Sequence, residues 1–168
     1  MRLKELGFDA IGVGKIRDIF NGRGLTASQP LHGNQNLLAA VSNLSREVTW
    51  RGLVFCNLVD FDMLYGHRNN VSGYAEELLR FDEWLGEFLK TMGDEELLIL
   101  TADHGNDPTT QSTDHSREQV PVLITSNGIA GRGGNLVTPE PGLYHVGKTV
   151  LRALGVDGDF PGLDLLAL

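Results

Sequence analysis

The chain has 168 residues, of which 41% are hydrophobic and 21% charged, as is usual for a single soluble globular domain. Its formal net charge is −8 and it has no Lys/Arg-rich run, which argues against nucleic acid as a partner. The amino-terminal residues do not resemble a signal peptide and no apolar stretch reaches bilayer length, so we expect a cytoplasmic protein with no membrane partner.

The predicted elements alternate between apolar strands and helices, which is typical of an α/β fold with a mostly parallel sheet flanked by helices. The run 53–59 has the near-continuous apolar pattern of a strand covered on both faces. It contains the only cysteine, Cys56, which we expect to be an unreactive buried thiol. In chain order we expect a helix-like turn at 2–6, a strand at 8–13, a helical turn at 16–20, a helix at 34–48, the strand 53–59, a long helix at 72–92, strands at 96–101 and 120–126, a Gly- and Pro-rich loop at 128–142 and a last helix at 143–154.

Two clusters of carboxylate and imidazole side chains follow the predicted strands 53–59 and 96–101. Carboxylate with imidazole is the ligand mix expected for divalent transition metals. Ligands in such sheets collect beyond the carboxyl ends of the strands, so both clusters should share one site. Two clusters in a short chain predict a two-metal centre of the kind that acts on phosphate esters. The first cluster contains Asp60, Asp62 and His67, and the second contains Asp103 and His104 with His115 beyond them.

A simpler interpretation of each histidine is a surface position or a hydrogen-bonded place in the core. We expect this for His32 and His145. The other three of the five histidines lie near aspartates at strand ends, and Gly66 and Gly105 stand beside two of them. Glycine gives the backbone freedom needed where a chain turns sharply or approaches an ion. The pattern therefore favours metal binding.

The motifs that carry these residues resemble those of the phosphopentomutases, within the alkaline phosphatase superfamily. The Asp-His-Gly run at 103–105 is shared across that superfamily and says little about substrate. The combination of Val-Asp-Phe-Asp, Tyr-Gly-His-Arg and Thr-Asp-His-Ser-Arg-Glu is specific to the phosphopentomutases. The resemblance covers nearly the whole chain and weakens after Ser126. The matching segments are 14–20, 57–62, 65–68, 73–74, 81–82, 101–108 and 113–118.

The resemblance implies an alkaline phosphatase-like core with two divalent ions, manganese being the expected metal. It assigns Asp62, His67 and His115 to one ion. It assigns Asp103 and His104 to the second, which the family completes with an aspartate from an amino-terminal segment. That segment also carries the threonine nucleophile, so we expect no catalytic nucleophile in this chain. Residues 1–168 would be the carboxyl-terminal part of an incomplete core domain without its cap, with residues 1–15 as the exit from the cap.

Two further residues, Lys15 and Asp60, are each open to two interpretations. Lys15 follows an apolar strand and precedes a helical turn, so it is either a contact for substrate phosphate or a solvated lysine. Asp60 either orients a metal ligand or is a surface carboxylate at a strand end.

The implied activity of the whole protein is metal-dependent interconversion of ribose 1-phosphate and ribose 5-phosphate, and of the deoxyribose forms, in nucleotide and pentose phosphate metabolism. We expect the chain alone to be inactive. One alternative is another mutase or phosphatase of the superfamily, such as a cofactor-independent phosphoglycerate mutase. Tyr65 makes the Asp62-to-His67 spacing five, whereas we expect four in that type. Another alternative is a non-catalytic metal-binding domain. The sequence does not indicate an oligomeric state.

Overall fold

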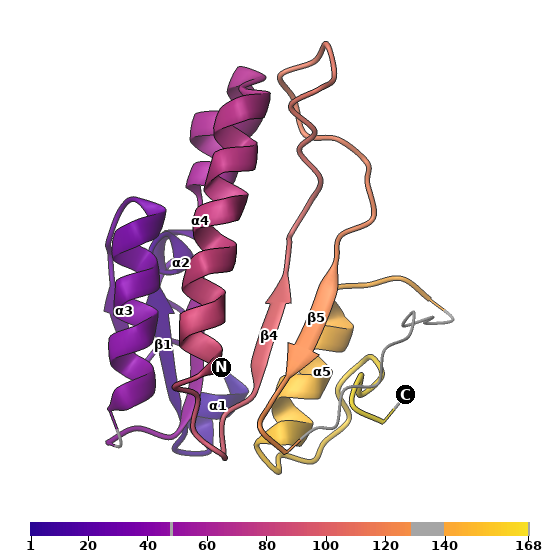
Figure 1. The fold of residues 1–168 in the computed structure, drawn as a ribbon. Coiled ribbons are helices and arrows are strands. Elements are labelled where there is room, and N and C mark those ends of the chain that lie inside the picture. Colours follow the sequence, from indigo (N-terminus) through magenta and orange to yellow (C-terminus); the bar gives the residue numbers. More distant parts are fainter. Residues whose placement is uncertain (48, 129–139, 168) are drawn as a thin grey trace.

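A three-stranded parallel sheet forms the centre of the fold, in the order β2–β1–β3 (Figure 1). The computed structural model describes residues 1–47, 49–128 and 140–167. The middle strand, β1 (Asp9–Val13), pairs with β2 (Ala27–Gln29) and with β3 (Gly52–Cys56). Ile11 lies opposite Ala27 on one side and Val54 on the other. The prediction of an α/β fold with a parallel sheet is therefore confirmed.

Helices cover both faces of this sheet because apolar side chains of the strands alternate between the faces. On one face, Ile11 and Val13 pack against α3 (Asn34–Arg46) in a buried cluster. On the other face, α1 (Arg2–Glu5) and α5 (Tyr144–Ala153) meet through a second apolar cluster. The first cluster contains Ile11, Val13, Leu37, Ala40 and Leu44, and the second contains Leu3, Leu151 and Val156 with Phe8 and Leu53 against them.

The last two strands form a separate antiparallel pair, which the sequence did not indicate. In this pair β4 (Leu98–Thr101) runs against β5 (Val122–Thr125), with Leu98 opposite Thr125. The long connection 102–121 extends beyond the carboxyl end of β4, as Figure 1 shows. The four expected strands are present, but only β1 and β3 among them are parallel, together with β2, which was not expected.

The polypeptide after β3 differs from the predicted strand 53–59. The strand ends at Cys56, and the chain then forms a π-helical turn, η1 (Phe61–Tyr65), and a 3-10 turn, η2 (Gly66–Arg68). Phe55 is 45% exposed, so the expectation of cover on both faces fails at this end of the strand. A helical turn, α2 (Ile16–Ile19), follows β1 in the same way.

The longest helix, α4 (Val71–Leu89), lies beside α3 on the face that Figure 1 presents. Its first turn is capped by Asn70, whose side chain accepts the Gly73 N–H. Trp84 of α4 donates its indole N–H to the Ser42 hydroxyl of α3 at 3.0 Å. Among the described residues no helix has the length and apolar character needed to cross a bilayer.

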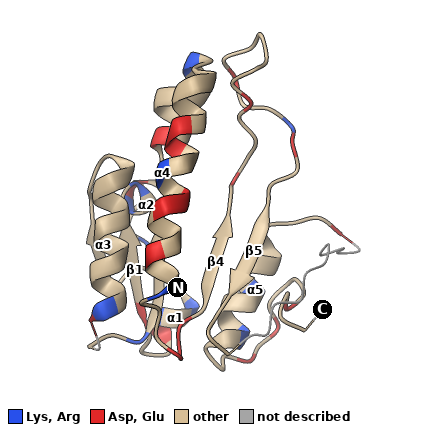
Figure 2. Ribbon diagram, in the orientation of Figure 1, with Lys and Arg blue, Asp and Glu red and all other residues tan. Residues whose placement is uncertain are grey.

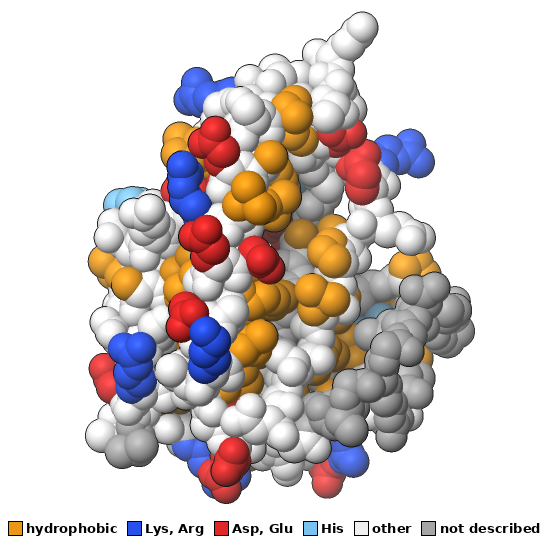
Figure 3. All heavy atoms as spheres, in the orientation of Figure 1, with side chains coloured by type: hydrophobic (Ala, Val, Ile, Leu, Met, Phe, Trp, Pro, Cys, Tyr) orange, Lys and Arg blue, Asp and Glu red, His pale blue; other side chains and the backbone are white. Residues whose placement is uncertain are grey.

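An apolar groove separates α4 from the β4–β5 pair. It encloses about 560 Å³, and Leu78, Leu79 and Leu123 on its walls are 49%, 65% and 61% exposed. Figure 3 shows hydrophobic side chains gathered between the helix and the strands. Figure 2 shows Lys and Arg on several elements and Asp and Glu at several positions along α4. Residues 129–139 of the expected Gly- and Pro-rich loop lie outside the described residues.

Candidate metal centre

The turns after β3 and the connection after β4 bring three of the predicted ligands together. Asp62 lies in η1 and His67 in η2, and Asp62 Oδ2 is 3.3 Å from His67 Nε2. His115 comes from the connection 102–121 and places its Nε2 3.3 Å from Asp62 Oδ1. One ligand atom from each of the three residues lies within 4.8 Å of the others. Residues separated by up to 53 positions thus converge on one point.

The spacing and protonation of these groups suit a divalent ion. Ligand atoms at about 2.0–2.2 Å from one metal are separated from their neighbours by roughly 3.0–3.5 Å. The two 3.3 Å separations fall in that range. His67 Nδ1 lies 2.5 Å from the Thr113 carbonyl oxygen, which can only accept, so Nδ1 carries the proton. The lone pair of Nε2 is therefore directed toward Asp62, in the orientation that a metal ligand requires.

The predicted second pair lies against this group. His104 stacks on His115 with 3.7 Å between ring centroids, and His115 stacks in turn on His67 at 4.8 Å. Asp103 Oδ2 is 3.7 Å from His104 Nε2. Among the described residues the only convergent group of three carboxylate, thiol or imidazole ligands is Asp62, His67 and His115. Asp103 and His104 therefore offer two ligands beside a three-ligand group.

Two asparagines that the motif analysis did not single out hold these loops in place. Asn106 donates from Nδ2 to Asp62 Oδ1 at 2.6 Å and so orients the carboxylate directly. Asn69, in the left-handed region at φ 50°, donates to the carbonyl oxygens of Thr110 at 2.5 Å and Ser112 at 3.3 Å. That contact fixes the chain just before Thr113 and His115. The only sequence signal was their place beside the histidine motifs.

Gly66 and Gly105 are needed for close approach of chain segments. Gly66 has φ −61°, which any residue adopts, but a Cβ there would overlap the side chain of Asn106. A Cβ at Gly105 would lie 3.0 Å from the Ser116 carbonyl oxygen, where the two strands of the loop bridge. Both glycines therefore let the connection 102–121 pack closely, and neither adopts a positive φ.

Lys15 and Asp60 lie at the same edge of the sheet. Lys15 is exposed between β1 and α2, and its Nζ is 4.0 Å from Met63 Sδ in η1. Asp60 is partly buried, and its Oδ2 accepts the backbone N–H of Asn34 at 2.8 Å. Asp60 is thus tied to α3, unlike a freely solvated carboxylate.

For His32, His145 and Cys56 we expect surface, structural or unreactive side chains. His32 is exposed. His145 is only 5% exposed; its Nε2 donates to the Glu140 carbonyl oxygen at 2.7 Å, and its Nδ1 accepts the Leu163 N–H at 2.8 Å. Burial raises the pKa of the Cys56 thiol from 9.0 to about 12, so it is protonated and unreactive near neutral pH.

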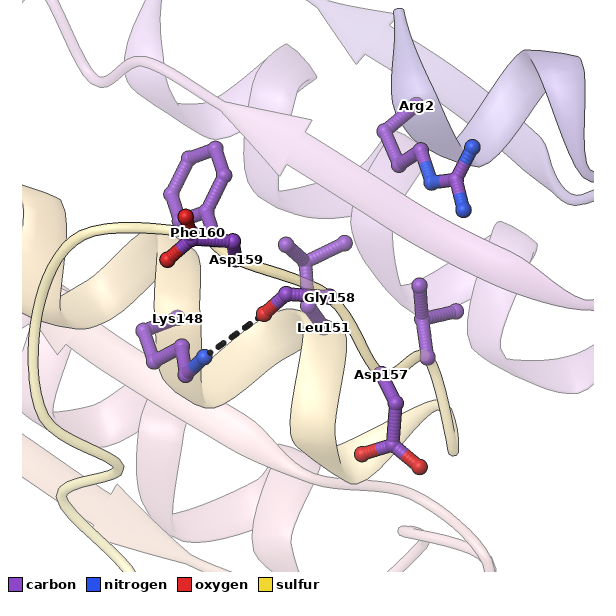
Figure 4. Close-up of a pocket in the computed structure, with 8 residues that line it drawn as sticks. Arg2, Lys148, Leu151, Asp157, Gly158, Asp159 and Phe160 are labelled. Atoms are coloured by element: carbon purple, nitrogen blue, oxygen red, sulfur yellow. Dashed lines mark hydrogen bonds between the residues drawn. The ribbon is translucent and has the colours of Figure 1, made fainter.

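A second hollow, of about 280 Å³, lies beside α5 and is shown in Figure 4. Arg2, Lys148 and Phe160 are among its lining residues, and Lys148 Nζ donates to the Gly158 carbonyl oxygen at 3.2 Å. None of the predicted site residues lines it. The predicted metal ligands therefore lie in the loops beyond β3 and β4 and not at this hollow.

Comparison with known proteins relates this site to a family. The phosphopentomutase of Clostridium kluyveri is 42% identical over 161 residues, which cover 96% of this chain and 41% of that protein. That of Anaeromyxobacter sp. (strain K) is 50% identical over 158 residues, covering 94% of this chain and 40% of that protein. That of Dictyoglomus thermophilum is 57% identical over 130 residues, covering 74% and 31%. The chain therefore spans about 40% of the length of the first two relatives.

The fold has a counterpart among solved structures. The structure of PH0037 protein from Pyrococcus horikoshii superimposes with a TM-score of 0.63 at 17% identity, covering 95% of this chain and 53% of that one. This likeness concerns the fold alone. Residues 10–158, which include every predicted ligand, match the Metalloenzyme superfamily. The chain therefore belongs to the Metalloenzyme superfamily.

Proposed function

We propose that the chain is the carboxyl-terminal part of a phosphopentomutase, which interconverts ribose 1-phosphate and ribose 5-phosphate, and the deoxyribose forms, when whole. The observation that carries the proposal is the convergence of Asp62, His67 and His115 within 4.8 Å, inside the motifs that resemble this family. Phosphopentomutases 42–57% identical to the chain support the choice of substrate class, a phosphorylated pentose. We place the protein in the cytoplasm because phosphorylated pentoses are charged metabolites retained inside cells.

The proposed cofactor is a pair of divalent ions, with manganese as the expected metal. When bound, such ions stabilise charge on transferring phosphoryl oxygens and lower the pKa of a nucleophile. The chain's own contribution is to orient the ligands: Thr113 fixes the tautomer of His67, and Asn106 fixes the carboxylate of Asp62. Exposed Lys15, beside η1, is available to bind a substrate phosphate. We assign Asp62, His67 and His115 to the first ion and Asp103 and His104 to the second.

The apolar groove supports the proposal that further polypeptide completes the core. Exposed leucines on α4 and β5 face a groove of about 560 Å³, and exposed apolar surface of this kind marks an interaction site. In the described residues β3 and β4 belong to different sheets, so each keeps an unpaired edge. We propose that an amino-terminal segment with the threonine nucleophile and the remaining aspartate completes this core. Residues 1–15 would then follow the cap domain and enter the core through β1.

The test is to read the DNA upstream of the Met1 codon and to express any in-frame extension with this chain. With manganese, the extended protein should interconvert ribose 1-phosphate and ribose 5-phosphate, and Asp103→Asn should abolish that turnover. Turnover of phosphoglycerates instead would favour the phosphoglycerate mutase alternative. Metal binding without turnover of either substrate, in an extended protein that lacks a nucleophile, would favour the non-catalytic domain.

A further inference from the structure

A buried polar network connects the first turn of α3 to the start of η1, the turn that carries the candidate ligand Asp62. Asn34 is 2% exposed and Glu77 of α4 is 6% exposed, so both are almost fully removed from solvent. Asn34 Nδ2 donates to Glu77 Oε1 at 2.8 Å, and Glu77 Oε2 pairs with Arg80 at 3.2 Å. At its other end Asn34 exchanges two bonds with Asp60: its backbone N–H donates to Asp60 Oδ2 at 2.8 Å, and its Oδ1 accepts the Asp60 N–H at 3.3 Å.

This network ends at the residue where η1 begins. Asp60 is the N-cap of η1, and Asp62 follows two residues later. Asp60 also serves α3, whose own N-cap is Gly33 and has no side chain to accept the first N–H groups. Its carboxylate is favoured there by the positive end of the helix. Asp60 is therefore held from two directions, by the α3 backbone and by the Asn34 side chain.

We propose that Asn34 is a positioning residue for the metal centre, acting through Asp60 on the orientation of Asp62. The proposal rests on the metal centre proposed above. The amide at position 34 satisfies both partners, because Glu77 must receive a hydrogen bond and the Asp60 N–H must donate one. Phe61 of η1 packs against Tyr74 and Phe81 of α4 with ring centroids 5.4 and 6.5 Å apart, but the Asp62 carboxylate itself is held by a hydrogen bond from Asn106. The direction of Asp62 therefore depends on polar contacts.

The experiment compares manganese affinity with stability in chelator for the intact chain. Asn34→Ala removes the side chain, and Leu44→Ala serves as the control because Leu44 lies in the buried cluster near the far end of the same helix. Both variants should melt at lower temperature in chelator. At a temperature where all proteins are folded, Asn34→Ala should bind the tighter manganese ion about tenfold more weakly, the low end for residues that orient ligands. Leu44→Ala should keep the wild-type affinity.

A double variant that exchanges the amide and the carboxylate of this pair tests whether manganese affinity can be restored. Asn34→Asp places a carboxylate oxygen against Glu77 and should weaken manganese binding, whereas Asn34→Asp with Glu77→Gln restores a donor and acceptor pair and should recover most of the affinity. The inference is overturned if Asn34→Ala binds manganese as wild type does, or if affinity falls equally in Leu44→Ala. If Asn34→Asp does not fold, the Asn34→Ala comparison decides alone. Failure of the wild type to bind manganese would refute the metal centre itself.

Discussion

The close approach of Gly66 to Asn106 gives the sharpest test of how the metal site is held. In Gly66→Ala the backbone is unstrained because φ is −61°. The new Cβ would lie 2.7 Å from Asn106 Oδ1, and closer still to Cγ, whereas ordinary contact begins at 3.4 Å. Asn106 would therefore withdraw by about 1 Å, which breaks its 2.6 Å hydrogen bond to Asp62.

The magnitude follows from that lost bond. A hydrogen bond to a charged group contributes about 1.5–3 kcal/mol, and the side chain of Asp62 is 30% exposed, so we expect the lower end. Denaturant unfolding in chelator should show Gly66→Ala to be less stable by about 1.5 kcal/mol. Manganese titration should show at least a tenfold loss of affinity, as for other residues that orient ligands.

Two controls separate this mechanism from a general effect of alanine. Gly86→Ala in α4 meets no atom within 4 Å and should stabilise the helix by about 0.5–1 kcal/mol. In an Asn106→Ala background, Gly66→Ala should cost almost nothing, because the clashing side chain is gone. The reasoning is refuted if Gly66→Ala is as harmless as Gly86→Ala, or if its cost is the same with and without Asn106.

Further predictions concern the ions, the thiol and activity. Manganese titration should show one site clearly tighter than the other, because three ligands converge at Asp62 and two at Asp103; two equally tight sites would mean an unrecognised ligand. His115→Ala should remove the tighter site and lower the melting temperature only when metal is present, and a wild type that melts identically in chelator would contradict the metal assignment. Since the pKa of Cys56 is raised from 9.0 to about 12, native protein at pH 8 should react with iodoacetamide about a thousandfold more slowly than unfolded protein. The raised pKa of Cys56 also couples unfolding to pH. The free energy of unfolding should fall as pH rises above about 9, because the unfolded state loses the thiol proton before the folded state does. The chain alone should not interconvert the ribose phosphates, and turnover abolished by Asp103→Asn would require a nucleophile within it, with Thr109 and Thr113 the first hydroxyls to substitute.

The helices and apolar strands could be predicted because hydrophobic periodicity follows directly from which face is buried. β2 could not, since Ala27–Gln29 is short and partly polar and is a strand only because β1 offers it a backbone edge. The antiparallel direction of β5 could not be predicted either. An apolar run predicts burial but not strand direction, and a 20-residue connection permits either.

The candidate ligands could be chosen from residue type and strand-end position, whereas the residues that hold them in place could not. Asp62, His67 and His115 carry chemistry that few other side chains provide. Asn106 and Asn34 are ordinary amides, and their roles arise from contacts with Asp62 and Glu77 across 44 and 43 residues of sequence. No local pattern encodes such a contact. We expected Gly66 to supply backbone freedom, but its φ is ordinary and its role is to leave space for the side chain of Asn106.

The loops that carry the candidate metal ligands are thus held differently from the rest of the described residues. Apolar clusters fix α3, α1 and α5 on the sheet, whereas side-chain amides fasten the connection 102–121 to η1 and to the turn after η2. A hydrogen bond is directional in a way that apolar contact is not, so amides can fix the angle of a carboxylate or an imidazole. Substitutions at residues that bind no ion should therefore change metal affinity while leaving the fold intact. Core substitutions should instead lower stability and leave metal affinity unchanged. This contrast between the two classes of variant distinguishes an oriented metal site from a chance cluster of acidic and imidazole groups.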